Sequence, residues 1–286
     1  MNTLIADSGA SKTDWVLLGE GEPQFIQTEG LNPHLVTAAE FMNVLSKELK
    51  PNILGKAVDK IHFYGSGCGS PQKQKEVESY LKEIFEFATV KVGTDLEAAG
   101  MALFGEKEGI VCILGTGSSS AVYANREIIK QMPSVGYPEG DQGSGSDIGK
   151  RILQLYKEQK LHTDLRKHLE NKIDMDSEKL TLMFKKTKEA KLFASQICKV
   201  MGTKSYYPQI QKILYEGFES FLKKVSMAFP DEVKSRELGF VGSIASVYEA
   251  ELRACAKQMN LEVKSVVRSP IEHIALQFLK NEGPTT

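Results

Sequence analysis

The stretch Asp7-Ser8-Gly9-Ala10-Ser11-Lys12-Thr13-Asp14 decides the fold, because it joins two short apolar runs through a loop of small residues. The runs at 3–6 and 15–18 are typical of strands, and a third strand is expected at 25–28. Strands this close in sequence are expected to pair as an antiparallel meander. The loop is not a P-loop, because Ser11 stands where that motif has glycine, and a strand follows instead of a helix.

Strands and helices alternate in the residues that follow. Apolar runs at 61–64 and 90–92 are typical of strands, and 96–104 has helical periodicity. Ser70 is a suitable helix N-cap with Pro71 at the first helical position, so another helix is expected between the two strands. Strands separated by helices are expected to be parallel.

The same order of elements returns in the second half of the chain. A strand, a Gly/Ser/Thr-rich loop and a strand are expected at 110–114, 115–119 and 121–123, and strand–helix units at 238–241, 247–258, 261–266 and 271–280. The sequence therefore predicts an α/β protein of two domains built on one plan, 1–108 and 109–270. The second carries a helical insertion over 147–233, and the final helix, 271–281, is expected to pack on the first domain.

Composition excludes several classes of protein. The chain has 286 residues, 41% hydrophobic and 26% charged, which is ordinary for a globular protein and unlike collagen, coiled coils or disordered chains. Its 36 basic and 37 acidic residues give a net charge of −1, so neither nucleic acid nor an anionic membrane is an expected partner. No signal peptide, membrane span or zinc motif is recognisable, and the four cysteines lie far apart. We therefore expect a cytoplasmic protein.

The two small-residue loops have the groups that bind anions. In the first, Ser11, Lys12 and Thr13 offer backbone N–H groups, hydroxyls and a cation, and Asp7 could hold a hydrated magnesium ion beside them. The alternative is an ordinary hairpin turn, which has no need of this combination. The loop at 115–119 is weak evidence alone, but two such hairpins could clamp a polyphosphate. Neither the loop at 115–119 nor the Gly/Ser-rich run at 143–149 completes the G-x-G-x-x-G fingerprint of dinucleotide binding.

Asp95 follows an apolar strand directly, so it is expected at the carboxyl edge of a sheet, where open α/β folds bind ligands. Two compatible interpretations stay open. Asp95 could be the N-cap of the helix that starts at Leu96. It could also be a general base that accepts the proton of a sugar hydroxyl.

Taken in order, five motifs resemble the sugar-kinase branch of the actin/Hsp70/hexokinase superfamily. They are residues 7–14, Gly93-Thr94-Asp95, Gly115-Thr116-Gly117-Ser118, Gly140-Asp141-Gln142-Gly143-Ser144 and Val241-Gly242-Ser243. The chain is most similar to the N-acetylglucosamine kinase group, which is grouped by sequence with the BadF/BadG/BcrA/BcrD ATPases, and the resemblance covers nearly its whole length. It implies two ribonuclease-H-like (actin-like ATPase) domains with a cleft between them.

The resemblance also implies an ATP- and Mg²⁺-dependent enzyme that phosphorylates a hydroxyl of an amino sugar. Asp95 would be the catalytic base, and Asp7 would hold Mg²⁺ through water. The nucleotide would be bound by Gly9, Ser11, Lys12, Thr13, Thr116, Gly117, Ser118, Gly242 and Ser243, and the sugar by Asn32, Ser66, Gly67 and Asp141. The implied sugar is N-acetylglucosamine or a close relative such as glucosamine or N-acetylmuramic acid, and a homodimer is a possible assembly.

Two departures from the family pattern leave the sugar and its hydroxyl open. Gln142 stands where the family has glutamate, and Ser119-Ser120 stands where asparagine is frequent. Two other functions of the same fold also stay open: an ATPase activator of a 2-hydroxyacyl-CoA dehydratase, and a non-catalytic sugar sensor. The activator would need cysteines placed for a shared iron–sulfur cluster, and a sensor would have no use for Asp95.

Overall fold

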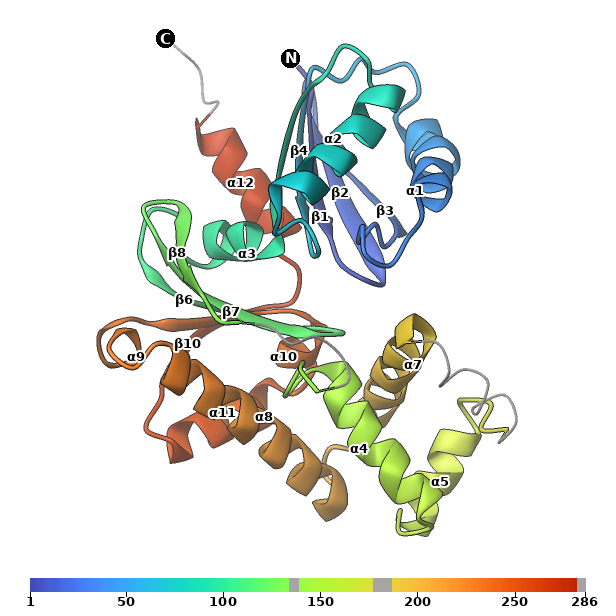
Figure 1. Ribbon diagram of the computed structural model, residues 1–286, viewed down its shortest axis with the longest axis vertical. Helices are drawn as coiled ribbons and strands as arrows, with labels where there is room; N and C mark the ends of the chain where they lie inside the picture. Colours follow the sequence, from blue (N-terminus) through green and yellow to red (C-terminus); the bar gives the residue numbers. More distant parts are fainter. Residues whose placement is uncertain (134–138, 177–186, 282–286) are drawn as a thin grey trace. The chain divides into compact units, whose positions relative to one another are not determined.

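The computed structural model describes residues 1–133, 139–176 and 187–281 (Figure 1). Contacts between residues divide the chain into two compact units. The first contains Met1–Lys107 and the C-terminal segment that begins at Ser269, and the second contains Glu108–Arg268. The chain thus returns to its first unit for the last helix, and the units divide one residue before the domain boundary expected at 108.

A five-stranded sheet of order β3-β2-β1-β4-β5 forms the centre of the first unit. Its strands are β1 (Thr3–Ser8), β2 (Lys12–Leu18), β3 (Gln24–Glu29), β4 (Lys60–Gly65) and β5 (Thr89–Thr94). The first three pair antiparallel, and β4 and β5 extend the sheet parallel to β1. The expected meander and the expected parallel strands are both confirmed.

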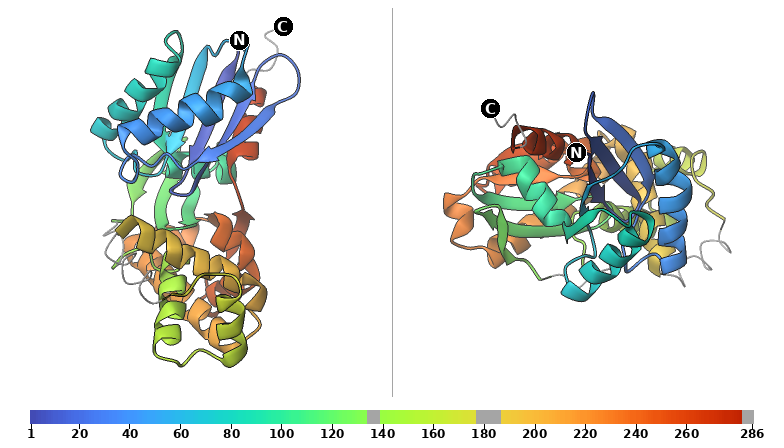
Figure 2. Two further views of the ribbon diagram at one scale, coloured as in Figure 1. Left: turned by 90° about the vertical axis from the view of Figure 1, so that its right-hand side faces the viewer. Right: turned by 90° about the horizontal axis from the view of Figure 1, so that it is seen from above.

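Helices cover both faces of this sheet, as Figure 2 shows. One face carries α1 (Ala38–Val44), the helical turns Leu45–Leu49 and Lys50–Ile53, and α2 (Pro71–Ile84); the other carries α3 (Asp95–Phe104) and α12 (Ile271–Asn281). Successive strand residues point to opposite faces. Leu4 and Ala6 therefore pack with α1 and α2, whereas Ile5 packs with α3 and α12.

The second unit repeats this topology in a sheet of order β10-β9-β6-β7-β8. Its strands are β6 (Gly109–Leu114), β7 (Ser118–Ala124), β8 (Glu127–Gln131), β9 (Leu238–Val241) and β10 (Val263–Val267). Again three strands form an antiparallel meander, and two more continue parallel to its first strand. Asn125 and Arg126 both have positive φ, as a two-residue turn between β7 and β8 requires.

Most helices of the second unit lie between β8 and β9 in sequence. They are α4 (Gly145–Lys157), α5 (Thr163–Glu170), α7 (Thr187–Val200), the turn Met201–Lys204, α8 (Pro208–Ala228) and α9 (Glu232–Ser235), followed by α10 (Ser243–Val247) and α11 (Glu249–Gln258). The expected continuous helix over 247–258 is wrong. The chain breaks at Tyr248, whose buried hydroxyl donates to the Cys198 carbonyl at 2.7 Å.

The described helices are those of a protein without an apparent bilayer-crossing segment in these residues. None of the helices there combines the length and the apolar character needed to cross a bilayer.

Candidate active site

Three neighbouring parallel strands of the first unit end in one row. The register pairs Ser8 of β1 with Gly65 of β4, and Gly65 with Thr94 of β5. The residues that follow each strand therefore meet at the carboxyl edge of the sheet. They are the first hairpin, the turn that begins at Ser66, and Asp95.

The first hairpin is a tightly closed turn. Ser8 pairs with Thr13 at its base, and the Gly9 N–H donates to the Lys12 carbonyl at 2.9 Å. The chain after β3 lies directly against it, since a Cβ on Gly30 would come within 2.6 Å of backbone atoms in the turn. Only glycine permits this approach. The hairpin is thus held in one conformation and can present backbone N–H groups to an anion.

Asp14 fixes the side chain of Lys12 beside this turn. Its buried carboxylate accepts hydrogen bonds from Lys12 Nζ at 2.6 Å, Gln27 Nε2 at 2.6 Å and Ser269 Oγ at 2.9 Å. Burial acts to raise the pKa of Asp14, but these three donors outweigh it and hold the pKa below its usual value. The Lys12 side chain is half exposed. Lys12 can therefore meet an anion while Asp14 sets its direction.

The Thr13 hydroxyl, by contrast, is engaged within the sheet. It donates to the Glu29 carbonyl at 3.0 Å and lies 2.9 Å from Ser8 Oγ. Ser8 Oγ also accepts the Leu31 N–H at 3.2 Å, so the two hydroxyls join the hairpin to the loop after β3. A contact from Thr13 to a phosphate stays a prediction, as do those of Gly9 and Ser11.

Three of the expected sugar-binding residues form one polar cluster. Asn32 Nδ2 donates to Ser66 Oγ at 2.9 Å, and a Cβ on Gly67 would lie 2.5 Å from Asn32 Oδ1. Gly67 has a φ of 87°, a conformation that favours glycine. The Ser66 N–H donates to the Ser8 carbonyl at 2.8 Å, which ties the cluster to the first hairpin. Contact of this cluster with a sugar stays a prediction.

Asp95 opens α3, but it is not the N-cap, so that interpretation is wrong. Thr94 caps the helix: its Oγ1 accepts the Glu97 N–H at 3.2 Å, and Glu97 Oε2 accepts the Thr94 N–H at 3.3 Å. This is a reciprocal capping box. Asp95 Oδ1 accepts the adjacent Leu96 N–H at 3.0 Å. The Asp95 carboxylate is therefore not required to start the helix.

Asp7 and Asp95 both have raised pKa values. The pKa of Asp7 is raised to about 7, first by burial and then by the negative charges of Asp95 and Asp14, against the opposing charge of Lys12. Burial also raises the pKa of Asp95 to about 6, against the opposing hydrogen bond from Leu96. Shifts of this size gather at functional sites. A carboxylate with a pKa near 6 is ionised at pH 7.5 and can accept a proton.

The surroundings of Asp7 fit a hydrated magnesium ion. The nearby charge of Asp95 disfavours a second carboxylate anion, and a cation would remove that penalty. In the part of the chain that the structure describes, no group of three or more His, Cys, Asp or Glu side chains could hold a metal by itself. Mg²⁺ at phosphate-transfer sites commonly keeps several waters and binds one or two carboxylates together with substrate phosphates. Asp7 suits that mode of binding.

The second hairpin is shorter than expected, because β7 begins earlier. Leu114 already pairs with Ser118, so Ser118 and Ser119 lie in the strand and not in a loop reaching 119. The Ser118 N–H donates to Asp141 Oδ1 at 3.1 Å, and a Cβ on Gly117 would lie 2.7 Å from the same oxygen. Asp141, expected at the sugar, thus lies directly on the expected phosphate loop.

The start of α4 and the end of β9 support this hairpin. The N–H groups of Gly145 and Ser146 donate to the carbonyls of Gly115 and Thr116, at 2.9 and 3.2 Å. Gly242 has a φ of 124°, and a Cβ there would collide with the Leu114 carbonyl. The structure therefore brings the expected adenosine loop, Gly242-Ser243, beside the second hairpin. The nucleotide contacts of these residues stay predictions.

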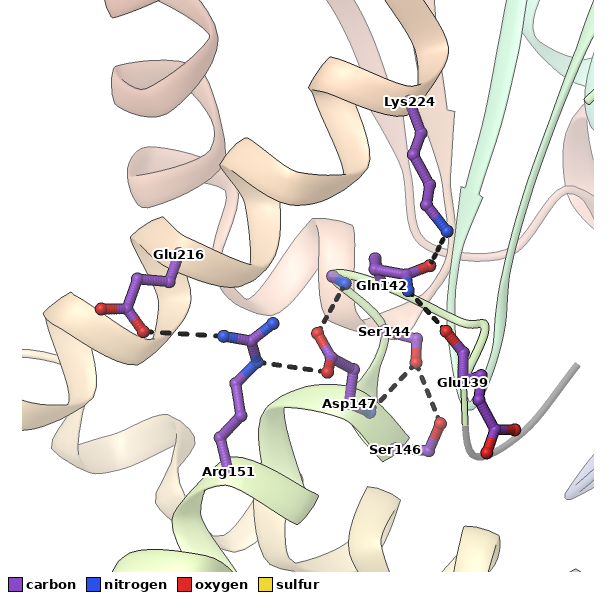
Figure 3. A network of polar contacts seen from close by, with 9 residues as sticks. Glu139, Gln142, Ser144, Ser146, Asp147, Arg151, Glu216 and Lys224 are labelled. Carbon is purple, nitrogen blue, oxygen red and sulfur yellow. Dashed lines mark hydrogen bonds and ion pairs between the residues drawn. The ribbon is translucent and has the colours of Figure 1, made fainter. Parts of the chain in front are cut away.

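A polar network holds the loop that carries Asp141 (Figure 3). Asp147, in the first turn of α4, accepts the Gly143 N–H at 3.1 Å and Arg151 Nε at 3.1 Å, while Ser144 Oγ accepts the Asp147 N–H at 3.3 Å. Arg151 also lies 3.6 Å from Glu216 on α8. The loop is thereby fixed to two helices.

Gln142 has a structural role in this network that explains its departure from the family pattern. Its Nε2 donates to the Glu139 carbonyl at 2.7 Å, and its Oε1 accepts from Lys224 Nζ at 2.8 Å (Figure 3). A glutamate carboxylate could accept the second bond but has no N–H for the first. An amide is therefore the side chain that satisfies both neighbours.

Two charged residues of the site were not predicted from the sequence. Asp14 could have been found, since it lies two residues after Lys12 in a strand, and such residues share a face. Lys191 on α7 lies 2.8 Å from Asp141 Oδ2. It is distant from Asp141 in the chain, so only the packing of α7 reveals the contact.

Several solved structures have the same fold as this chain. A candidate N-acetylglucosamine kinase from Porphyromonas gingivalis is 29% identical, with a TM-score of 0.88 over 99% of this chain and 100% of that one. A candidate N-acetylglucosamine kinase from Chromobacterium violaceum is 17% identical, with a TM-score of 0.74 over 96% and 98%. A ROK family glucokinase from Streptomyces griseus, solved with glucose and AMPPNP, is 13% identical, with a TM-score of 0.59 over 94% of each chain. No family profile and no curated protein matches the chain.

These likenesses show what the chain is similar to. Its fold is that of sugar kinases in the actin/Hsp70/hexokinase superfamily, and the expected pair of ribonuclease-H-like domains is confirmed. Within that branch, the structure from Porphyromonas gingivalis confirms the resemblance to the N-acetylglucosamine kinase group that the five motifs indicated.

Proposed function

We propose that this protein is an ATP-dependent sugar kinase that transfers the γ-phosphoryl group to a hydroxyl of an amino sugar. N-acetylglucosamine is the first choice, with glucosamine and N-acetylmuramic acid as close alternatives. The observation that carries the proposal is Asp95, a carboxylate that is not needed as a helix cap, has a pKa of about 6 and follows the strand next to the Ser66 turn.

The first step of the reaction needs a base near the attacking hydroxyl. Ser66 and Asp95 follow neighbouring paired strands, and the charge of Asp95 contributes, after burial, to raising the pKa of Cys68 in that same turn. A sugar held by the cluster of Asn32, Ser66 and Gly67 would therefore have its hydroxyl close to a proton acceptor. Asp95 takes the hydroxyl proton as the sugar oxygen attacks the γ-phosphorus, and ADP leaves.

The remaining catalytic effect is positioning and electrostatic stabilisation. Lys12, directed by Asp14, and the N–H groups of the first hairpin offer positive charge to the transferred phosphoryl group. Asp7 would hold Mg²⁺ through water, and the ion would supply charge neutralisation of the phosphates. Gly117, Gly242 and Ser243 in the second unit are assigned to the rest of the nucleotide.

The cysteines argue against the dehydratase activator. All four cysteines are buried free thiols, in the Ser66 turn, in β6, in α7 and in α11. A cluster shared between subunits needs exposed ligands, and a colourless aerobic preparation is the expected result. The presence of Asp95 argues against a non-catalytic sensor.

The test is ADP release measured over a panel of N-acetylglucosamine, glucosamine, N-acetylmuramic acid, N-acetylmannosamine and glucose, each against a reaction without sugar. We expect release that depends on at least one amino sugar and exceeds that with glucose. Release that is independent of every sugar would point to an ATPase, and release with glucose alone would reject the amino sugar.

A further inference from the structure

Asp141 is held in an unusual state for a surface loop residue. It is 8% exposed and has a φ of 62°, a left-handed conformation that non-glycine residues rarely adopt. Its Oδ1 accepts the Ser118 N–H at 3.1 Å. Its Oδ2 accepts no hydrogen bond from the described residues, although Lys191 Nζ lies 2.8 Å from it as an ion-pair partner.

Lys191 reaches this position because α7 packs unusually close to α4. A Cβ on Gly149 of α4 would collide with the Ala194 carbonyl of α7, and one on Gly145 would lie 2.7 Å from Ser195 Oγ. Two glycines four residues apart therefore let the helix backbones approach each other. Lys191 is one turn before Ser195 on α7, so the same close packing carries its ammonium group over the second hairpin.

The ammonium group lies at the phosphate loop as well as at the carboxylate. A Cβ on Gly117 would lie 3.0 Å from Lys191 Nζ and 2.7 Å from Asp141 Oδ1. An isolated carboxylate at this place would be costly to bury and would repel a phosphate bound to the same hairpin. Lys191 compensates both effects by pairing with Asp141, whose buried Oδ2 still has a lone pair for a hydroxyl donor.

We propose that Lys191 is a positioning residue of the sugar site: it acts through Asp141, holding that carboxylate in the orientation in which Oδ2 can accept a hydrogen bond from a sugar hydroxyl. The proposal rests on the proposed function for the identity of the ligand. The part of the proposal that says Lys191 acts only through Asp141 rests on the structure alone.

A double-mutant cycle tests this dependence. Lys191→Met, Asp141→Asn and the double variant are compared in sugar KM, ATP KM and thermal unfolding, with Lys191→Arg as the conservative variant. Lys199→Met, on the exposed side of the same helix, is the matched control. Lys191→Gln replaces Lys191→Met if the latter fails to fold.

We expect Lys191→Met to raise the sugar KM by roughly tenfold, which is one good hydrogen bond lost, with a change in ATP KM of less than about threefold. In the Asp141→Asn background, Lys191→Met should have no further effect on the sugar KM. The effects of substituting two contacting residues that act as a unit are not additive. Lys191→Arg keeps most of the sugar affinity, and Lys199→Met behaves as wild type.

Additive effects of the two substitutions would overturn the proposal, as would a rise confined to ATP KM, which would make Lys191 a direct phosphate ligand. If the wild-type protein phosphorylates no sugar, the proposed function fails, and thermal unfolding decides the inference by itself. In that case, Lys191→Met must lower the unfolding temperature of the protein that retains Asp141, but must not lower that of the Asp141→Asn variant. Equal lowering in both would reject the coupling.

Discussion

Asp95→Asn is the perturbation that separates chemistry from structure in this fold. The amide keeps the size of the carboxylate and still has an oxygen that can accept the Leu96 N–H. It cannot accept a proton from the sugar. Since Thr94 caps α3, the substitution leaves the capping box in place.

The expected magnitude follows from the pKa of Asp95, which is about 6. At pH 8 nearly all wild-type molecules carry an ionised base, so the loss measured there is the full contribution of proton transfer. Removal of a general base typically costs about 10²–10⁴-fold in rate, or about 2.7–5.5 kcal/mol of transition-state stabilisation. The variant removes a negative charge that raises the pKa of Asp7, so Asp7 should titrate at lower pH.

The assay is steady-state ADP release with the best sugar from pH 5 to 9, alongside thermal unfolding. At saturating Mg²⁺, which keeps Asp7 ionised, wild-type kcat/KM should fall below about pH 6 because the base is active only when it is ionised. This acid limb should be absent from Asp95→Asn. Thr94→Ala is the matched control: it should cost about 1 kcal/mol of stability through loss of the cap and retain kcat. Near-full activity of a folded Asp95→Asn protein at pH 8 would refute the assignment of the base.

Three further perturbations have separate expected outcomes. Gly117→Val should displace Asp141 from the Ser118 N–H and crowd the hairpin. The variant should still fold, and its ATP KM should rise about tenfold or more. An unchanged ATP affinity by calorimetry would contradict the nucleotide role of this hairpin. Asn32→Ala should raise the sugar KM roughly 10–100-fold and leave the ATP KM within about twofold, whereas equal changes in both would reject its sugar role. The pKa of His62 is lowered to about 4, first by burial and then by the charges of Lys91 and Lys60. His62 therefore binds a proton more readily in the unfolded chain than in the folded one. The free energy of unfolding should fall as the pH drops from about 6.5 towards 4. His62→Phe should reduce that loss by about 2 kcal/mol in chemical unfolding at pH 4 and keep the aromatic contact with Phe278, and an unchanged pH profile would show that His62 is not responsible.

Local signals were enough for the elements and for the residues at strand ends. Ser70 caps α2 with Pro71 in its first turn, as the sequence indicates, and the small-residue hairpin from Gly9 follows a strand whose last two residues are Asp7 and Ser8. The Thr94 cap was also readable, because Thr94 and Glu97 have the spacing of a capping box. Asp95 lacks this spacing, because the glutamate of the capping box, Glu97, lies three residues after Thr94 and only two after Asp95.

The contacts between distant segments could not be read from the sequence. Lys191 meets Asp141 only because Gly145 and Gly149 let two helices approach, and Gln142 matters only beside a carbonyl and a lysine of other segments. The break at Tyr248 has the same origin, since its hydroxyl is drawn to a carbonyl on α7. Helical periodicity continues through such a residue and cannot show its partner.

Transfer of radiolabel from [γ-³²P]ATP tests the central claim most directly, because it follows the phosphoryl group itself. The protein is incubated with labelled ATP, Mg²⁺ and N-acetylglucosamine, and the products are separated by chromatography. The account predicts a labelled sugar monophosphate with wild-type protein and at least about 100-fold less with Asp95→Asn. Label found only in inorganic phosphate, in equal amounts with and without each amino sugar of the panel, would contradict it.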